Sequence, residues 1–172
     1  MVYFKKIAAP GKYHDDMAIY DVLAYITQKE KTPSGHIFSS DKQIPNFNSI
    51  PILATYMNNV AKCYGKFSHI RLHHFILTFK PDDVNLLPFI ANDICDYIGR
   101  TYQVVVAQHE DTPHPHLHVV FNSVSFVNGY KYRGGKEDYY ELIDQMRSIV
   151  HKYGLHPLIP VKYIPNFNSP HE

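Results

Sequence analysis

The sequence predicts an α+β fold, in which helices pack on one mainly antiparallel sheet. Short runs rich in β-branched and aromatic residues alternate with segments of helical periodicity, and each helical segment stands alone between strands. The clearest two strands flank a connection in which Pro113 and Pro115 interrupt the extended pattern. A chain of 172 residues, 45% of them hydrophobic, can bury the core of one such domain.

The expected strands are short and bounded by turn-forming residues. The run from His73 to Phe79 is the clearest single strand, and Lys80-Pro81 ends it. Asn128-Gly129 is a tight-turn signal that can return the next residues as a short strand. Extended segments are therefore expected at residues 2–8, 36–40, 73–79, 102–109, 116–126 and 130–132.

Four segments carry apolar residues at helical spacing, at about residues 16–29, 49–64, 86–97 and 138–153. In the first, Tyr25 lies at the edge of the apolar stripe, where it can face away from the core. Ser49 is expected to cap the second helix. Asp138 with Glu141 resembles a capping box for the fourth.

Residues 107–122, AQHEDTPHPHLHVVFN, concentrate histidines between two strands. His109 ends the first strand, and His116 and His118 begin the second. Because side chains alternate along a strand, the latter two share one face and Leu117 points to the other. Three imidazoles on neighbouring strands can hold a divalent metal and leave positions open for water or substrate. The alternative is a histidine-rich surface hairpin that binds metal adventitiously.

Composition limits the other classes of function. The formal net charge is only +1, so a nucleic-acid surface would have to be a local patch. No run is long and apolar enough for a membrane span, and no membrane partner is expected. Cys63 and Cys95 lie far apart and form no metal-ligand or redox motif. They are typical of reduced, buried thiols, which favours a cytoplasmic location.

The histidine-rich segment also resembles a known family. The string HEDTPHPHLHVVFNSV, which begins at His109, resembles the histidine motif of conjugative relaxases. Conjugative relaxases are mobilisation nucleases of the HUH endonuclease superfamily, and this sequence resembles their MOB-P type. The string LAYITQKEKT, which begins at Leu23, is similar to their N-terminal tyrosine motif, and HHFILTF to their middle strand. Residues 131–155 are similar to the segment that follows, so the resemblance covers about residues 23–155.

The resemblance implies a five-stranded antiparallel sheet and cleavage of one DNA strand at the nic site of a transfer origin. It implies that His109, His116 and His118 are ligands of a divalent metal, with Mg²⁺ or Mn²⁺ expected. Tyr25 would be the nucleophile, forming a 5′-phosphotyrosine link that can be reversed to rejoin the strand. Asp111 would orient a ligand or assist the loss of the phenolic proton.

DNA is therefore the expected partner, as a single strand or hairpin at the transfer origin, together with accessory relaxosome proteins. Of the adjacent His73 and His74, one is expected in the core, and His74 is the candidate that approaches a phosphate. Tyr132, Tyr139 and Tyr140 are candidates for stacking on unpaired bases. The other candidate phosphate contacts are Arg71, Lys131, Arg133 and Lys136, although isolated surface charges are often only solvated.

Two other functions stay open. A rolling-circle replication initiator would share the metal site, but such initiators carry the tyrosine after the histidines, whereas Tyr25 precedes them. A module that binds metal or DNA without cleavage is the alternative from another class. Residues 1–160 are expected to form a single relaxase domain, and residues 161–172 a tail that leads to further domains of a longer protein, such as one encoded by a plasmid or integrative element.

Overall fold

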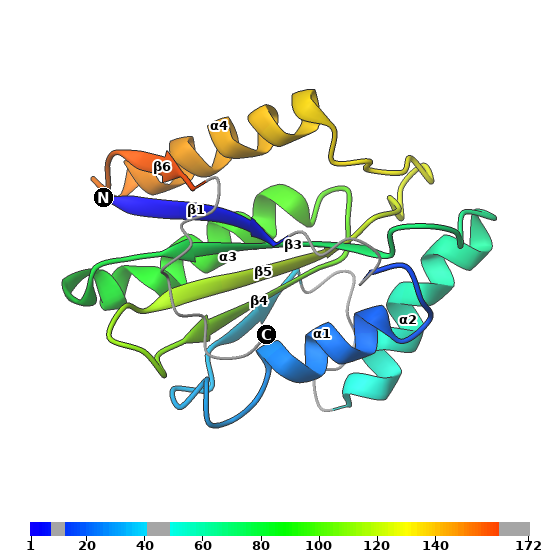
Figure 1. Ribbon diagram of the computed structural model, residues 1–172, viewed down its shortest axis with the longest axis horizontal. Coiled ribbons are helices and arrows are strands. Elements are labelled where there is room, and N and C mark those ends of the chain that lie inside the picture. Colours follow the sequence, from blue (N-terminus) through cyan, green and yellow to red (C-terminus); the bar gives the residue numbers. More distant parts are fainter. Residues whose placement is uncertain (8–12, 41–48, 162–172) are drawn as a thin grey trace.

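Six strands form one sheet in the computed structural model, which describes residues 1–7, 13–40 and 49–161 (Figure 1). The strands are β1 (Val2–Ile7), β2 (Ile37–Ser39), β3 (Leu72–Thr78), β4 (Val104–His109), β5 (His116–Asn122) and β6 (Leu158–Pro160). The helices are α1 (Ala18–Ile26), α2 (Ile50–Cys63), α3 (Leu87–Ile98) and α4 (Lys136–Lys152), with a 3₁₀ helix, η1 (Pro81–Leu86), before α3. The predicted α+β class is confirmed.

The sheet order is β2-β4-β5-β3-β1-β6. All neighbouring strands pair antiparallel except β1 and β6, which are parallel. The sheet therefore has one strand more than the family resemblance implies, because β6 is added at the edge beside β1. Strand β6 is only three residues long and ends at Pro160, so its sequence carries no period-two pattern that predicts a strand.

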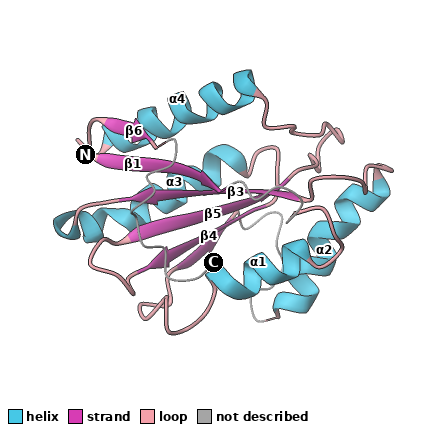
Figure 2. Ribbon diagram, viewed as in Figure 1, coloured by secondary structure: helices cyan, strands magenta, loops and turns pink. Residues whose placement is uncertain are grey.

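The two faces of the sheet are covered by different helices (Figure 2). Leu117, Val119 and Phe121 of β5 enter the core that contains α3 and α4. Val120, which points the other way, packs in the second core with residues of α1 and α2. His118 shares the face of Val120, because both positions are even-numbered on the same strand. The histidines of β5 therefore lie on the side of α1.

Several predicted boundaries and caps are corrected. Helix α4 begins at Lys136, and the carboxylate of Asp138 accepts hydrogen bonds from the backbone N–H groups of Gly134 and Gly135 at 3.0 and 3.2 Å. The predicted capping box of Asp138 with Glu141 is thus wrong, since Asp138 caps from the third helical position. Ser49 is the N-cap of α2, but its side chain makes no capping hydrogen bond.

Other local predictions differ in extent. Strand β5 ends at Asn122, and residues 130–132 contribute only an isolated bridge between Lys131 and Val124. Cys95 is buried as expected, whereas Cys63 is exposed. In the described ranges, no helix is both long and apolar enough to cross a membrane. Residues 162–172 of the predicted tail lie outside the described residues.

Acid should destabilise the fold through His73, which lies on the α3 and α4 side of the sheet. Its ring stacks on Phe121 and donates to the carbonyl of Tyr132 at 2.8 Å, and burial lowers its pKa from 6.5 to about 4. Between these two values the unfolded chain binds a proton that the folded chain does not. Stability should therefore fall as the pH drops through this window, by about 2 kcal/mol at pH 5 from His73 alone.

Urea denaturation at pH 7.5 and pH 5 measures this effect. The matched variant is His73→Gln, which keeps a donor for Tyr132 but does not titrate. The loss of stability between the two pH values should be about 2 kcal/mol smaller in this variant. Equal losses in both proteins would show that His73 does not contribute.

Candidate metal and nucleophile site

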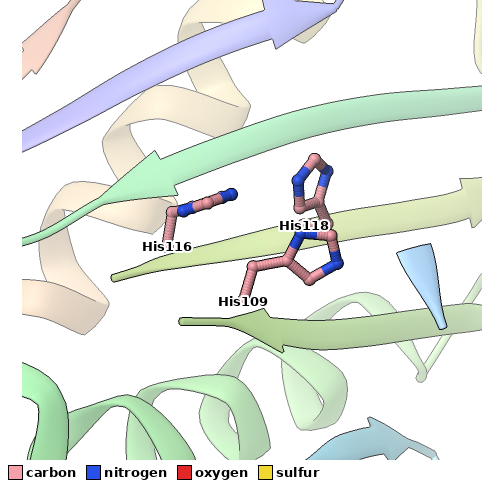
Figure 3. Close-up of side chains that lie close together, drawn as sticks. All are labelled: His109, His116 and His118. Carbon is pink, nitrogen blue, oxygen red and sulfur yellow. The ribbon is translucent and has the colours of Figure 1, made fainter. Parts of the chain in front are cut away.

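His109, His116 and His118 converge on one face of β4 and β5 (Figure 3). The antiparallel register places His109 directly opposite His116, and Ala107 opposite His118. One ring nitrogen from each histidine lies within 4.8 Å of the others. The donor set fits a divalent metal, because three neutral imidazoles at this spacing leave further coordination positions open.

Backbone carbonyls orient two of these rings. Nε2 of His109 donates to the carbonyl of Ile26 at 2.8 Å, and Nδ1 of His116 donates to the carbonyl of His114 at 3.1 Å. Each bond fixes which nitrogen carries the proton. The remaining nitrogens, Nδ1 of His109 and Nε2 of His116, are therefore the ones available to a metal.

The third ring is held by a buried chain of side chains. Nδ1 of His118 lies 2.8 Å from Nε2 of His74, whose Nδ1 lies 3.2 Å from the hydroxyl of Tyr13. For Nε2 of His118 to be a ligand, Nδ1 must carry the proton and donate to His74, which in turn donates to Tyr13. His74 is only 5% exposed, so it supports His118 rather than reaching a phosphate in solvent.

Burial keeps the imidazoles in the form that binds metal. It lowers the pKa of His109 to about 4, with a smaller opposing effect from the hydrogen bond to Ile26. It also lowers the pKa of His116, and it lowers that of His118 well below the usual value. All three rings are therefore neutral near pH 7, as a ligand must be.

Replacing His74 with alanine should weaken metal binding roughly 10- to 100-fold, because His118 loses the acceptor that fixes its ring. Calorimetric titration with Mn²⁺ measures the change. His74→Gln, whose amide oxygen can accept from Nδ1 of His118, should recover part of the affinity. If both variants bound Mn²⁺ as tightly as the unmodified chain, His74 would have no supporting role.

Tyr25 lies in the last turn of α1 and faces the histidines. Its ring centroid is 5.9 Å from that of His118 and 6.2 Å from that of His109, and 37% of the residue is exposed. The following residue, Ile26, holds His109 through its carbonyl. The end of α1 is therefore hydrogen-bonded to the candidate metal site, and the ring of Tyr25 lies next to that site.

Lys31 is a site residue that the sequence did not single out. Its Nζ lies 3.7 Å from the centroid of the Tyr25 ring, and its charge contributes to lowering the pKa of His109, His116 and His118. Its carbonyl accepts from the backbone N–H of Glu110 at 3.0 Å, which fixes the turn after α1 to the end of β4. The only sequence signal was its place in the segment that follows Tyr25.

Asp111 is exposed beyond the end of β4. Among the described residues, its carboxylate makes no hydrogen bond, and the three candidate ligands are instead oriented by backbone carbonyls and by His74. Its charge does raise the pKa of His109 and His116, against the larger lowering by burial. Asp111 is close enough to act electrostatically without fixing a ring.

Comparison with known proteins now identifies the family. The family described as "Relaxase: MobA/VirD2-like, nuclease domain" matches residues 25–155. The chain belongs to this relaxase family. The matched range begins at Tyr25 and includes the three histidines, so the predicted resemblance is confirmed.

Curated relatives agree with this assignment. The relaxase chain is 34% identical to a Protein rlx of Staphylococcus aureus over 85 residues, which are 48% of this chain and 27% of the relative. A second Staphylococcus aureus Protein rlx is 33% identical over 96 residues, covering 54% and 30% of the two chains. The Group II intron-interrupted relaxase LtrB of Lactococcus lactis is 37% identical over 65 residues, covering 35% and 11%. The chain thus spans less than a third of these relatives, and no solved structure matches it significantly.

The predicted DNA contacts of the relaxase domain are dispersed. Arg71 is 8% exposed, pairs with Asp16 at 3.0 Å and stacks on Phe67 at 3.6 Å, so little of it can reach a phosphate. It precedes β3, whose opposite end, Thr78, pairs with His116. Arg71 is thus at the end of the sheet away from the metal site.

The other basic candidates differ in whether their side chains are already hydrogen-bonded. Lys131 donates to the carbonyls of Ser68 and Lys66, which holds its ammonium against the loop before β3. Arg133 and Lys136 are exposed and make no hydrogen bond or ion pair with any described residue. These last two are therefore unpaired, but they flank Gly134, which contacts His73, so like Arg71 they lie at the end of the sheet away from the candidate metal site.

Proposed function

We propose that this relaxase domain nicks one strand of DNA at a transfer origin, with Tyr25 as the nucleophile beside a divalent metal held by His109, His116 and His118. The observation that carries this proposal is the position of the Tyr25 ring, within 6.2 Å of the His109 ring and 5.9 Å of the His118 ring on the same face of the sheet. We further propose Mg²⁺ or Mn²⁺, of which nitrogen ligands favour Mn²⁺.

In the proposed reaction, the Oη of Tyr25 forms a bond to phosphorus and the bond from phosphorus to the 3′ oxygen breaks. The products are a 5′-phosphotyrosine link and a free 3′-hydroxyl, which can attack the link later and rejoin the strand. When bound, the cation supplies positive charge that offsets the negative phosphate oxygens. Asp111 is the proposed acceptor of the phenolic proton, and a water molecule supplies the proton that the departing 3′ oxygen takes up.

The ammonium of Lys31 supplies a second positive charge. Lying 3.7 Å from the ring centroid, it stabilises the negative charge that develops on the phenol as its proton leaves. A phosphate that reached Tyr25 would also lie near this ammonium. The proposed nucleophile, the ammonium of Lys31 and the three proposed metal ligands would therefore act on the same phosphate.

Replacing Lys31 with alanine should slow cleavage about 100-fold, because one charge that stabilises the transition state is lost. Affinity for Mn²⁺ should change far less. Lys29→Ala removes an exposed lysine from the same turn and is the matched control, with no more than a small effect expected. Single-turnover cleavage measures both rates. An equal loss in the two variants would show that Lys31 contributes only to the overall positive charge of the turn and has no specific role beside Tyr25.

The wider partners are part of the proposal. The substrate is proposed to be single-stranded or hairpin DNA at the transfer origin, bound with accessory relaxosome proteins. Residues 1–160 are proposed to be the nickase domain, and residues 161–172 a tail that leads to further domains. Arg133 and Lys136 are proposed phosphate contacts, because their exposed side chains make no other bond in the described part of the chain.

Incubation of the chain with single-stranded oligonucleotides and Mn²⁺ tests the proposal. A covalent adduct that survives denaturation supports nicking by an attached nucleophile. Tight binding without any adduct would support the alternative of a module that does not cleave. The rolling-circle alternative shares the chemistry, and the position of Tyr25 before the histidines argues against it.

A further inference from the structure

A pocket lies on the face of the sheet opposite the metal site. Its volume is ≈ 370 Å³, and it is formed where the end of α3 meets the start of α4. Phe121 lines it, and Phe121 belongs to the α3 and α4 core, whereas His118 faces the other side. The pocket and Tyr25 therefore lie on opposite faces of the sheet, and none of the proposed catalytic residues lines the pocket.

Aromatic rings dominate the lining. The rings of Tyr102, Phe121 and Tyr132 form a contiguous cluster, with centroids 5.2 to 5.9 Å apart. Tyr97 and Tyr130 line the pocket as well. The face of an aromatic ring is negatively polarised and attracts cations.

The charged side chains of the lining also favour a cation. Asp138 and Glu141 are negative and Arg100 is positive, so the three sum to −1. Burial raises the pKa of Tyr102 to about 12, and the charges of Asp138 and Glu141 add to this rise. The phenol of Tyr102 therefore stays neutral near pH 7.

We propose that this pocket binds the side chain of an arginine presented by a partner protein. A guanidinium is planar, so it can lie on the rings of Tyr102 or Tyr130, and its N–H groups can donate to the carboxylate of Glu141. Asp138 is already engaged by the backbone N–H groups of Gly134 and Gly135. Glu141 is exposed and makes no hydrogen bond or ion pair with any residue the structure describes, so it is the carboxylate available to a ligand.

The test is an NMR titration of the ¹⁵N-labelled 172-residue chain with N-acetyl-arginine amide. Saturable shifts are expected at the pocket residues, with a dissociation constant on the order of 1 mM. N-acetyl-citrulline amide has the same shape without the charge and should bind at least about tenfold more weakly. Free L-arginine should bind no better than the capped form, since the partner presents a side chain.

Glu141→Gln should weaken binding of the arginine probe about tenfold. Glu137→Gln, which removes another exposed acid of α4 outside the pocket, should leave it unchanged. Four outcomes would overturn the proposal: equal binding of citrulline, tighter binding of free arginine, tighter binding of deoxyadenosine monophosphate, or no saturable shift below about 50 mM. None of these readouts involves DNA cleavage, so the result is independent of the nicking activity.

Discussion

Tyr25→Phe should abolish the covalent adduct between this relaxase domain and single-stranded DNA. The substitution removes only the hydroxyl, so the ring beside His118 and the cation of Lys31 keep their places. Without a nucleophilic oxygen, adduct formation should fall by roughly 10⁴-fold or more. Denaturing gels of end-labelled oligonucleotides measure the adduct directly.

Tyr20→Phe is the matched control, because Tyr20 lies one and a half turns earlier on the same helix. This variant should form adduct at close to the unmodified rate. An adduct that persisted in Tyr25→Phe and vanished in Tyr20→Phe would show that Tyr20, and not Tyr25, is the nucleophile. Mn²⁺ affinity should be unchanged in both, which separates the nucleophile from the metal centre.

His116→Ala should remove both metal binding and cleavage while the fold survives. His116 is the partly exposed member of the three, whereas His109 and His118 are buried, so its loss leaves the core intact. Removing one of three protein ligands should lower the rate of cleavage about 10³-fold or more. Calorimetry with Mn²⁺ and adduct formation report the two losses, and circular dichroism reports the fold.

His114→Ala is the control for this second prediction. The side chain of His114 is exposed, and its contact with His116 is made through the backbone carbonyl, which the substitution keeps. Metal binding should therefore be retained. Normal nicking by His116→Ala would mean that the ligand assignment is wrong.

The central strands and the grouping of the histidines were predictable because alternation along β5 is a local property. Once His116 and His118 share a face, the short connection returns His109 to the opposite position on β4. Strand β6 was not predictable, since three residues that end in a proline pair with β1 only through tertiary contacts. Asp138 was assigned the wrong cap position because Gly134 and Gly135 supply backbone donors that no side-chain pattern reveals.

The supporting groups of the site were less accessible to sequence reasoning. The carbonyl of Ile26 orients His109, and a backbone acceptor leaves no trace in residue type. His74 was expected near a phosphate. It lies on β3, which pairs with β1 and β5, and there its ring is hydrogen-bonded to that of His118. Arg71 was expected at DNA because it is basic, but residue type does not show that Asp16 and Phe67 enclose it.

Mass spectrometry of the DNA-linked peptide identifies the residue that attacks the phosphate. The tryptic peptide 13–29 contains Tyr13, Tyr20 and Tyr25, so fragmentation must locate the nucleotide remnant within it. We expect a phosphodiester on Tyr25 alone, with the 5′ oxygen of the DNA retained. A remnant on any other residue, or no linked peptide under conditions in which DNA is cleaved, would contradict it.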